Sequence, residues 1–126
     1  MSGKTGKFIT KLLPEGIVLT QVQDGAEISV EDARQNTLDV ITVTGGKISP
    51  LLVDTRNIHS ISKEARDHFS MRERKGNVNS IAILIHSPLS KIIGNFFMGL
   101  NKPTVPTKLF TDQRTAMAWL KTFLNK

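Results

Sequence analysis

Cysteine and tyrosine are both missing from the 126 residues, and each absence excludes a kind of chemistry. Without cysteine the chain forms no disulfide and offers no thiolate as a nucleophile or metal ligand. This composition fits a reducing compartment, and we expect a cytoplasmic protein. Without tyrosine, and without the interleaved aromatic and basic residues that stack on bases, the sequence does not favour nucleic-acid binding.

Long apolar runs are missing as well. No stretch reaches the roughly 18 consecutive apolar residues that a membrane-spanning helix needs. The first residues, MSGKTGKFITKLL, contain neither the apolar region nor the cleavage site of a signal peptide. We expect a flexible N-terminus over residues 1–7 and one domain over residues 8–126, a length typical of single domains.

Charge is distributed unevenly along the chain, whose net charge is +6. No acidic residue lies between Glu73 and Asp112, whereas this interval contains Arg74, Lys75, Lys91, Lys102 and Lys108. Such a basic interval can attract an anionic partner. A basic surface that is only solvated is the alternative interpretation.

Hydrophobic periodicity predicts strands that alternate with helices. We expect strands over Phe8–Leu13, Ile17–Gln23, Leu51–Thr55, Ser80–His86 and Thr107–Phe110. Pro14 and Gly16 favour a turn between the first two strands, which therefore form a hairpin. The strongly apolar run that starts at Ser80 is typical of a central parallel strand.

The expected helices have recognisable ends. Ser29 and Asp32 resemble a capping box at the start of the first helix, which Gly45–Gly46 ends. Its expected inward residues are Val30, Ala33, Thr37, Val40 and Ile41. Ser62 can cap a second helix, and Thr111 or Asp112 can cap the last one, whose expected inward residues are Ala116, Leu120, Phe123 and Leu124.

The third helix starts at Ser87, with Pro88 at the first helical position. Its apolar stripe, expected in the core, consists of Leu89, Ile92, Ile93, Phe96, Phe97 and Leu100. The opposite face includes Lys91, Gly94, Asn95 and Met98. Glycine permits close approach and methionine suits adaptable contacts, so this face is a candidate docking surface.

The predicted order is ββαβαβαβα, an α/β fold with a largely parallel sheet, an N-terminal antiparallel hairpin and packed helices. Several segments resemble a family of small bacterial proteins of unknown function that is related to STAS domains and the SpoIIAA-like fold. They are Ser49–Asp54, Thr55–Arg66, Ser87–Pro103, Thr107–Asp112 and Ala116–Leu120. The resemblance covers nearly all of residues 8–125 and implies a SpoIIAA-like, STAS-like fold.

The resemblance also implies a class of function. STAS domains are generally non-enzymatic regulatory or scaffold modules, and some bind nucleotides or lipids. The related CRAL-TRIO-type proteins bind lipids. Asp54 matches the aspartate of the STAS "D-L-S" strand, but an ungapped reading places Lys63 and Glu64 where the phosphorylated serine would lie. We therefore do not expect a phosphorylation switch in this chain.

Ligands of open α/β sheets bind beyond the carboxyl ends of the strands, near helix N-termini that favour anions. The candidate residues at this edge are Asp54, Arg56, Ser60, Ser62, His86 and Ser87. An enzyme could use His86 as base, Ser87 or Ser60 as nucleophile and Asp54 as the orienting carboxylate. However, the chain has no G-x-S-x-G elbow, and Ser87 already serves as a cap, so we expect no catalysis.

We expect no metal and no cofactor either, because His59, His68 and His86 do not have the spacing of paired metal ligands. The sequence thus predicts a non-catalytic, STAS-like interaction module that acts around its second and third helices. A homodimer or another protein is the expected partner. The alternative is a binding protein for an anionic or apolar small molecule, either a lipid or a nucleotide.

Overall fold

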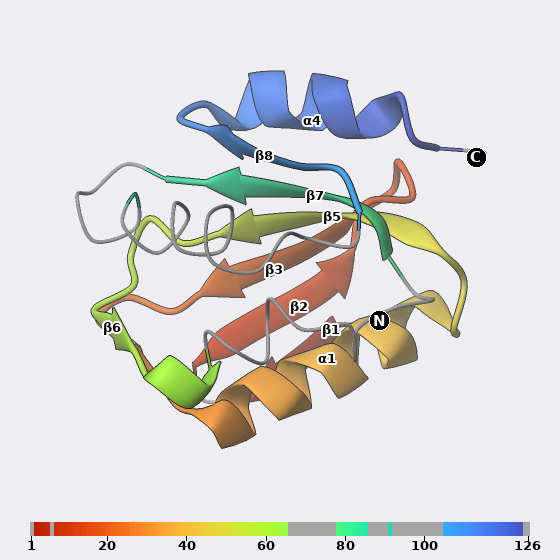
Figure 1. The fold of residues 1–126 in the computed structure, drawn as a ribbon. Coiled ribbons are helices and arrows are strands. Elements are labelled where there is room, and N and C mark those ends of the chain that lie inside the picture. Colours follow the sequence, from red (N-terminus) through yellow and green to blue (C-terminus); the bar gives the residue numbers. More distant parts are fainter. Residues whose placement is uncertain (1, 6, 66–77, 86–90, 92–104, 125–126) are drawn as a thin grey trace.

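A six-stranded sheet forms the centre of the fold (Figure 1), in a computed structural model that describes residues 2–5, 7–65, 78–85, 91 and 105–124. The sheet order is β1-β2-β3-β5-β7-β8. Its strands are β1 (Ser2–Thr5), β2 (Phe8–Leu12), β3 (Val18–Val22), β5 (Ser49–Asp54), β7 (Val78–Leu84) and β8 (Thr107–Phe110). The pairs β1–β2 and β2–β3 are antiparallel, and the other neighbours are parallel.

The helices α1 (Val30–Thr44) and α4 (Gln113–Lys121) cover opposite faces of this sheet. Leu51 of β5 packs in one cluster with residues of α1, whereas the next residue, Leu52, packs in another cluster with residues of α4. Because successive side chains of a strand point to opposite faces, the two helices lie on different sides. The α/β architecture with a largely parallel sheet and an N-terminal hairpin is therefore confirmed.

The N-terminus contributes a strand that the sequence does not predict. Ser2–Thr5 form β1 and pair with β2 in a second antiparallel ladder. Hydrophobic periodicity does not indicate this strand, because SGKT contains no apolar residue. Such a strand is held by backbone hydrogen bonds to its neighbour, and the strand signals in a sequence come from side chains.

The predicted ends of α1 are confirmed. Ser29 and Asp32 form a reciprocal capping box, in which the Ser29 amide donates to Asp32 Oδ2 at 2.9 Å. Gly45 ends the helix with a left-handed φ of 64°, which glycine adopts without strain. Burial opposes ionisation of Asp32, but hydrogen bonds from Ser29 and the nearby Lys7 ammonium outweigh it and lower the pKa of that carboxyl.

The rotation of α1 about its own axis differs from the sequence-based expectation. The buried residues of the helix are Ala33, Asn36, Val40 and Val43, while Ile41, expected inside, is 42 % exposed and Thr37 is half-buried. The physical reason is a polar contact beneath the helix. The hydroxyls of Thr10 and Thr20 donate to Asn36 Oδ1 at 2.8 and 3.3 Å, so the amide turns inward.

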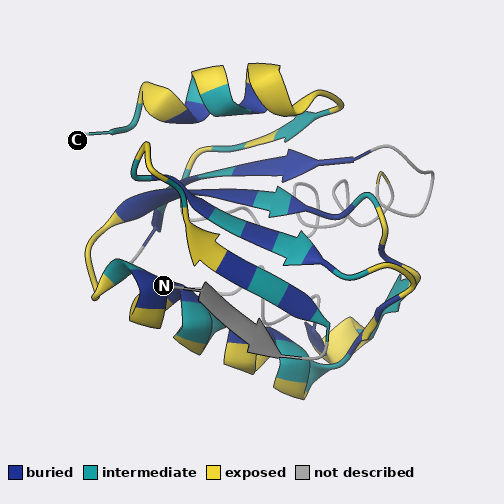
Figure 2. Cartoon of the chain, turned by 180° about the vertical axis from the view of Figure 1, so that it is seen from behind, coloured by how far each residue is buried: buried dark blue, intermediate teal, exposed yellow. Residues whose placement is uncertain are grey.

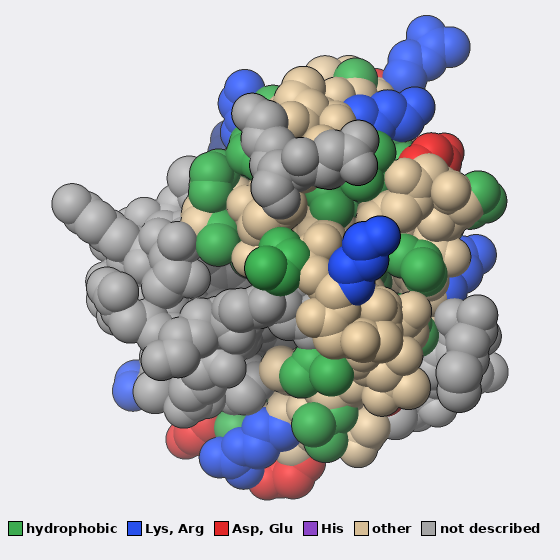
Figure 3. Space-filling model, turned by 90° about the vertical axis from the view of Figure 1, so that its right-hand side faces the viewer, with side chains coloured by type: hydrophobic (Ala, Val, Ile, Leu, Met, Phe, Trp, Pro, Cys, Tyr) green, Lys and Arg blue, Asp and Glu red, His purple; other side chains and the backbone are tan. Residues whose placement is uncertain are grey.

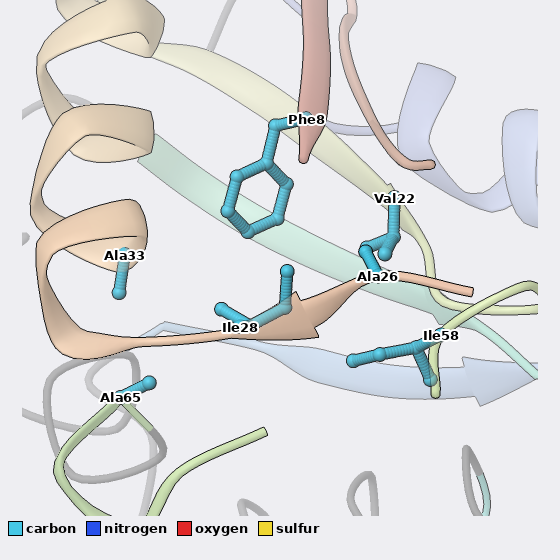
Figure 4. Packing of buried hydrophobic residues seen from close by; sticks show 7 residues of the cluster. All are labelled: Phe8, Val22, Ala26, Ile28, Ala33, Ile58 and Ala65. Atoms are coloured by element: carbon cyan, nitrogen blue, oxygen red, sulfur yellow. The ribbon is translucent and has the colours of Figure 1, made fainter. Parts of the chain in front are cut away.

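A cluster of buried apolar residues lies at the start of α1, between the main sheet and a small parallel pair of strands, β4 (Glu27–Ile28) and β6 (Ser60–Ile61). Figure 4 shows the Phe8 ring directed from β2 into the space near Ala33 and Ile28. Phe8 is 2 % exposed. The ring therefore packs β2, the first strand of the predicted hairpin, against α1.

The last helix agrees with the sequence-based expectation except at Phe123, which follows the end of the helix and is half-buried, with its ring against that of Trp119. Asp112 caps α4 by accepting from the Thr115 amide at 2.8 Å. Ala116 and Leu120 are buried against the sheet, and Leu124 packs on the same cluster. Among the helices that the structure describes, none is long and apolar enough to cross a membrane.

The second and third helices lie mostly outside the described residues. Ser62 does accept from the Ala65 amide at 3.0 Å, as expected of a helix cap, and the positions after Ser62 are helical up to Ala65. The apolar stripe from Leu89 to Leu100 lies outside the described residues, so its expected place in the core stays a prediction.

Replacing Asn36 tests the contact that orients α1. Asn36→Ala should lower the free energy of unfolding by about 2 kcal/mol, because it leaves two buried hydroxyls without their acceptor. The neighbouring exposed change Gln35→Ala should cost less than about 0.5 kcal/mol. Urea unfolding of both variants measures this difference, and equal stabilities would contradict the orienting role of Asn36.

Candidate functional site

Asp54 and Arg56 form the centre of the predicted site at the carboxyl ends of the parallel strands. Asp54 ends β5 and is only 3 % exposed, although a carboxylate is costly to bury. The Arg56 guanidinium compensates this cost with two parallel hydrogen bonds, from Nε to Oδ1 at 3.0 Å and from Nη2 to Oδ2 at 2.9 Å. The Arg56 backbone amide also donates to Oδ1, at 3.1 Å.

Both carboxylate oxygens of Asp54 are therefore engaged within its own loop. The hydrogen bond to Asp54 raises the pKa of Arg56 above its usual value, against the opposing effect of partial burial. Thr55, between them, is buried and donates from its hydroxyl to the Leu84 carbonyl of β7 at 2.8 Å. This geometry fixes the strand-to-loop transition and joins the ends of β5 and β7.

Ser60 and Ser62 belong to a different part of the structure, the segment that pairs with β4. Ser60 lies in β6 opposite Glu27, and its amide donates to the Ala26 carbonyl at 3.2 Å. The Ser62 amide donates to the Ile28 carbonyl at 2.8 Å, while its side chain caps the following turn. These bonds hold the two serines to residues 26–28, whereas Asp54 and Arg56 bond to each other.

The remaining predicted site residues are not all placed. Lys91 is helical and exposed. His86, Ser87, Gly94, Asn95 and Met98 lie outside the described residues, so their roles stay predictions. Within the described part of the chain, no three histidine or acidic side chains are placed together so that they could hold a metal ion.

A cavity that sequence reasoning missed lies at the opposite end of the sheet. It measures about 290 Å³. Its lining consists of Leu12, Glu15, Gly16, Thr44, Lys47, Ile48, Ser49, Pro50, Phe123 and Leu124. Figure 3 views the molecule from the side of these strand ends and shows hydrophobic side chains spread over the surface, with basic groups among them. Because the cavity is lined by three segments that are far apart in the sequence, no local motif could have indicated it.

A second feature absent from the sequence prediction is an apolar pair on the outside of α1. Leu38 and Ile41 are 56 % and 42 % exposed, one helical turn apart. They lie among the exposed residues Glu31, Arg34 and Thr42, and we call these five positions the outer face of α1. Figure 2 shows exposed residues along this side of the helix. The helical spacing of the pair is the only sequence signal for this surface, and the same spacing also places Ile41 on the expected core side of the helix.

Comparisons with known proteins bear on the fold. A family described as "Domain of unknown function (DUF7793)" matches residues 11–124. An uncharacterised protein of the DUF3478 family from Shewanella loihica PV-4, with a SpoIIAA-like fold, superposes with a TM-score of 0.66 at 20 % identity, over 95 % of this chain and 98 % of that one. This chain therefore has a SpoIIAA-like fold.

A protein of unknown function from Arthrobacter sp. FB24 is 32 % identical, over 88 % of this chain and 90 % of its own, with a TM-score of 0.35. A search of curated proteins finds no match.

Removing the Arg56 side chain tests whether the Asp54–Arg56 pair supports the fold. Arg56→Ala should lower the free energy of unfolding by about 2 kcal/mol, since it leaves a buried carboxylate without its charged partner. That figure is below the cost for a fully buried pair because the Arg56 side chain is 33 % exposed. The matched change Arg114→Ala, on the exposed side of α4, should cost less than about 0.5 kcal/mol. Equal urea midpoints for the two variants would show that the pair is dispensable.

Proposed function

Because the chain belongs to the DUF7793 family of domains of unknown function, we propose its role from the structure: a non-catalytic module that acts by protein–protein association and pairs with a second copy of itself. The observation that carries this proposal is the outer face of α1. The surface of a helix that faces water is normally polar. Here Leu38 and Ile41 expose large apolar side chains next to each other. Covering them would remove apolar surface from water, which favours association.

The polar residues at the strand ends support association over catalysis. Asp54 uses both of its oxygens to bind Arg56. Thr55 bonds to the Leu84 carbonyl, and Asp112 accepts from the amide and the hydroxyl of Thr115. Each of these groups has a structural role that explains its presence. The enzymatic alternative depends on His86 and Ser87, which lie outside the described residues.

A second candidate function is the binding of a small molecule in the cavity of about 290 Å³. Leu12, Pro50 and Phe123 offer it apolar surface, and Lys47 is among the lining residues. A lipid fragment with an anionic head would match both features, since apolar pockets with a few charged groups are typical ligand sites. This alternative also fits the resemblance to lipid-binding CRAL-TRIO-type folds. For either role, the lack of cysteine supports a proposed cytoplasmic location.

Native mass spectrometry of the protein purified from its own cells separates the two functions. The association proposal predicts a peak at twice the chain mass of 13.9 kDa, with no added small molecule. Light scattering over a dilution series should then show the dimer dissociating to the monomer. A monomer at every concentration would contradict self-association. A monomer that carries the mass of a lipid or nucleotide would establish the second candidate instead.

A further inference from the structure

We infer that two copies of the chain pair through the outer face of α1, with the two helices antiparallel about a two-fold axis. Leu38 of each copy then packs against Ile41 of the other. This inference rests on the proposed self-association and specifies the surface and the geometry through which it occurs.

The spacing of exposed residues along α1 forms a contact stripe of the required shape. Glu31, Arg34, Leu38, Ile41 and Gly45 follow one another at intervals of three and four residues and are all exposed. Such spacing places side chains on one side of a helix. The fifteen residues of α1 span about 22 Å, and the apolar pair lies near the middle of that length. Hydrophobic residues at the centre of a polar stripe are the usual pattern of a helix–helix interface.

The opposite side of α1 is already covered, so only the outer face is available to a partner. Ala33, Asn36, Val40 and Val43 are buried between the helix and the sheet. Leu38 projects away from this buried row, because the helical repeat of about 100° per residue places position 38 opposite its centre. A second copy would therefore add a layer outside α1 without disturbing the core.

Charge decides between the possible orientations of the second helix. The first turn of α1 carries Glu31, whereas Lys47 follows the end of the helix. With Leu38 opposite Ile41, an antiparallel helix brings Glu31 of one copy beside Lys47 of the other, and it does so twice because of the symmetry. Arg34 then lies beside the carboxyl end of the other helix, where the helix dipole favours a cation. A parallel pair would instead place Glu31 beside Glu31 and Arg34 beside Arg34.

The same charges favour a second copy over an anionic partner. The outer face of α1 carries one acidic residue, Glu31, and one basic residue, Arg34, and Lys47 beyond the end of the helix brings the net charge of the contact surface only to +1. An anionic ligand or a membrane would gain little from such a surface, because its attraction depends on a local excess of positive charge. A weakly charged surface with an apolar centre, which complements its own two-fold image, is what self-association requires.

Charge exchange between the two ends of the stripe tests this geometry. Glu31→Lys and Lys47→Glu should each raise the dimer dissociation constant roughly three- to tenfold, because each places like charges together at two symmetric points. The double variant should return to within about twofold of the original, since it restores both pairs with their signs exchanged. Sedimentation velocity over a concentration series measures all four proteins.

Leu38→Lys should raise the dissociation constant by about 100-fold or more, because it places charge at the centre of the apolar contact. Leu12→Lys is the matched control: Leu12 is 42 % exposed, as Ile41 is, but lies on β2 beside the cavity. This control should dimerise normally. Circular dichroism confirms that both variants remain folded.

The possible failures are distinguishable. An unsubstituted chain that is monomeric at every concentration overturns both the self-association and this interface. A dimer that resists Leu38→Lys, or one in which the double charge exchange gives no rescue, overturns the antiparallel α1 pair and leaves self-association standing. Dissociation by Leu12→Lys alone would move the interface to the cavity end of the sheet.

Discussion

The contact of Asn36 with Thr10 and Thr20 determines how α1 lies on the sheet, and much of the surface depends on it. A buried amide without partners would be costly, so the helix keeps the side of Asn36 against the hairpin strands. With that side fixed, Val40 and Val43 fill the core and Leu38 and Ile41 face outward. The proposed contact surface is thus exposed because the buried Asn36 amide has to keep its hydrogen-bond partners inside the fold.

The two ends of the sheet differ in what their residues do. At the carboxyl ends, where open α/β sheets usually bind ligands, the described polar groups of Asp54, Arg56 and Thr55 bond to one another or to the backbone. At the amino ends, the loops leave a cavity with a mixed apolar and polar lining. The fold alone therefore does not locate a binding site. The hydrogen bonds that each side chain already makes have to be considered as well.

The sequence predicted those features that depend on local physics. The cap at Ser29, a cap at either Thr111 or Asp112, the stop at Gly45 and the apolar strands could be predicted, because each follows from hydrogen bonding or periodicity within a few residues. The structure selects Asp112. The side of α1 that faces the sheet could not be predicted. Asn36 is buried because it accepts hydrogen bonds from Thr20 and Thr10, which are 16 and 26 positions away in the sequence. The cavity was not predicted for the same reason, because segments far apart in the sequence line it. The strand β1 was not predicted because SGKT has no apolar residue, although its partner β2 follows directly.

The rotation of α1 can be measured directly with single cysteines, because the chain has none of its own. Thr42 is exposed and Val43 is buried, and the two neighbours are similar in shape, so Thr42→Cys and Val43→Cys form a matched pair. A thiol reagent should modify the cysteine at position 42 of the native protein quickly, and the one at position 43 only as fast as the structure opens. Rapid modification at position 43 with protection at position 42 would contradict the orientation of α1 and with it the proposed interface.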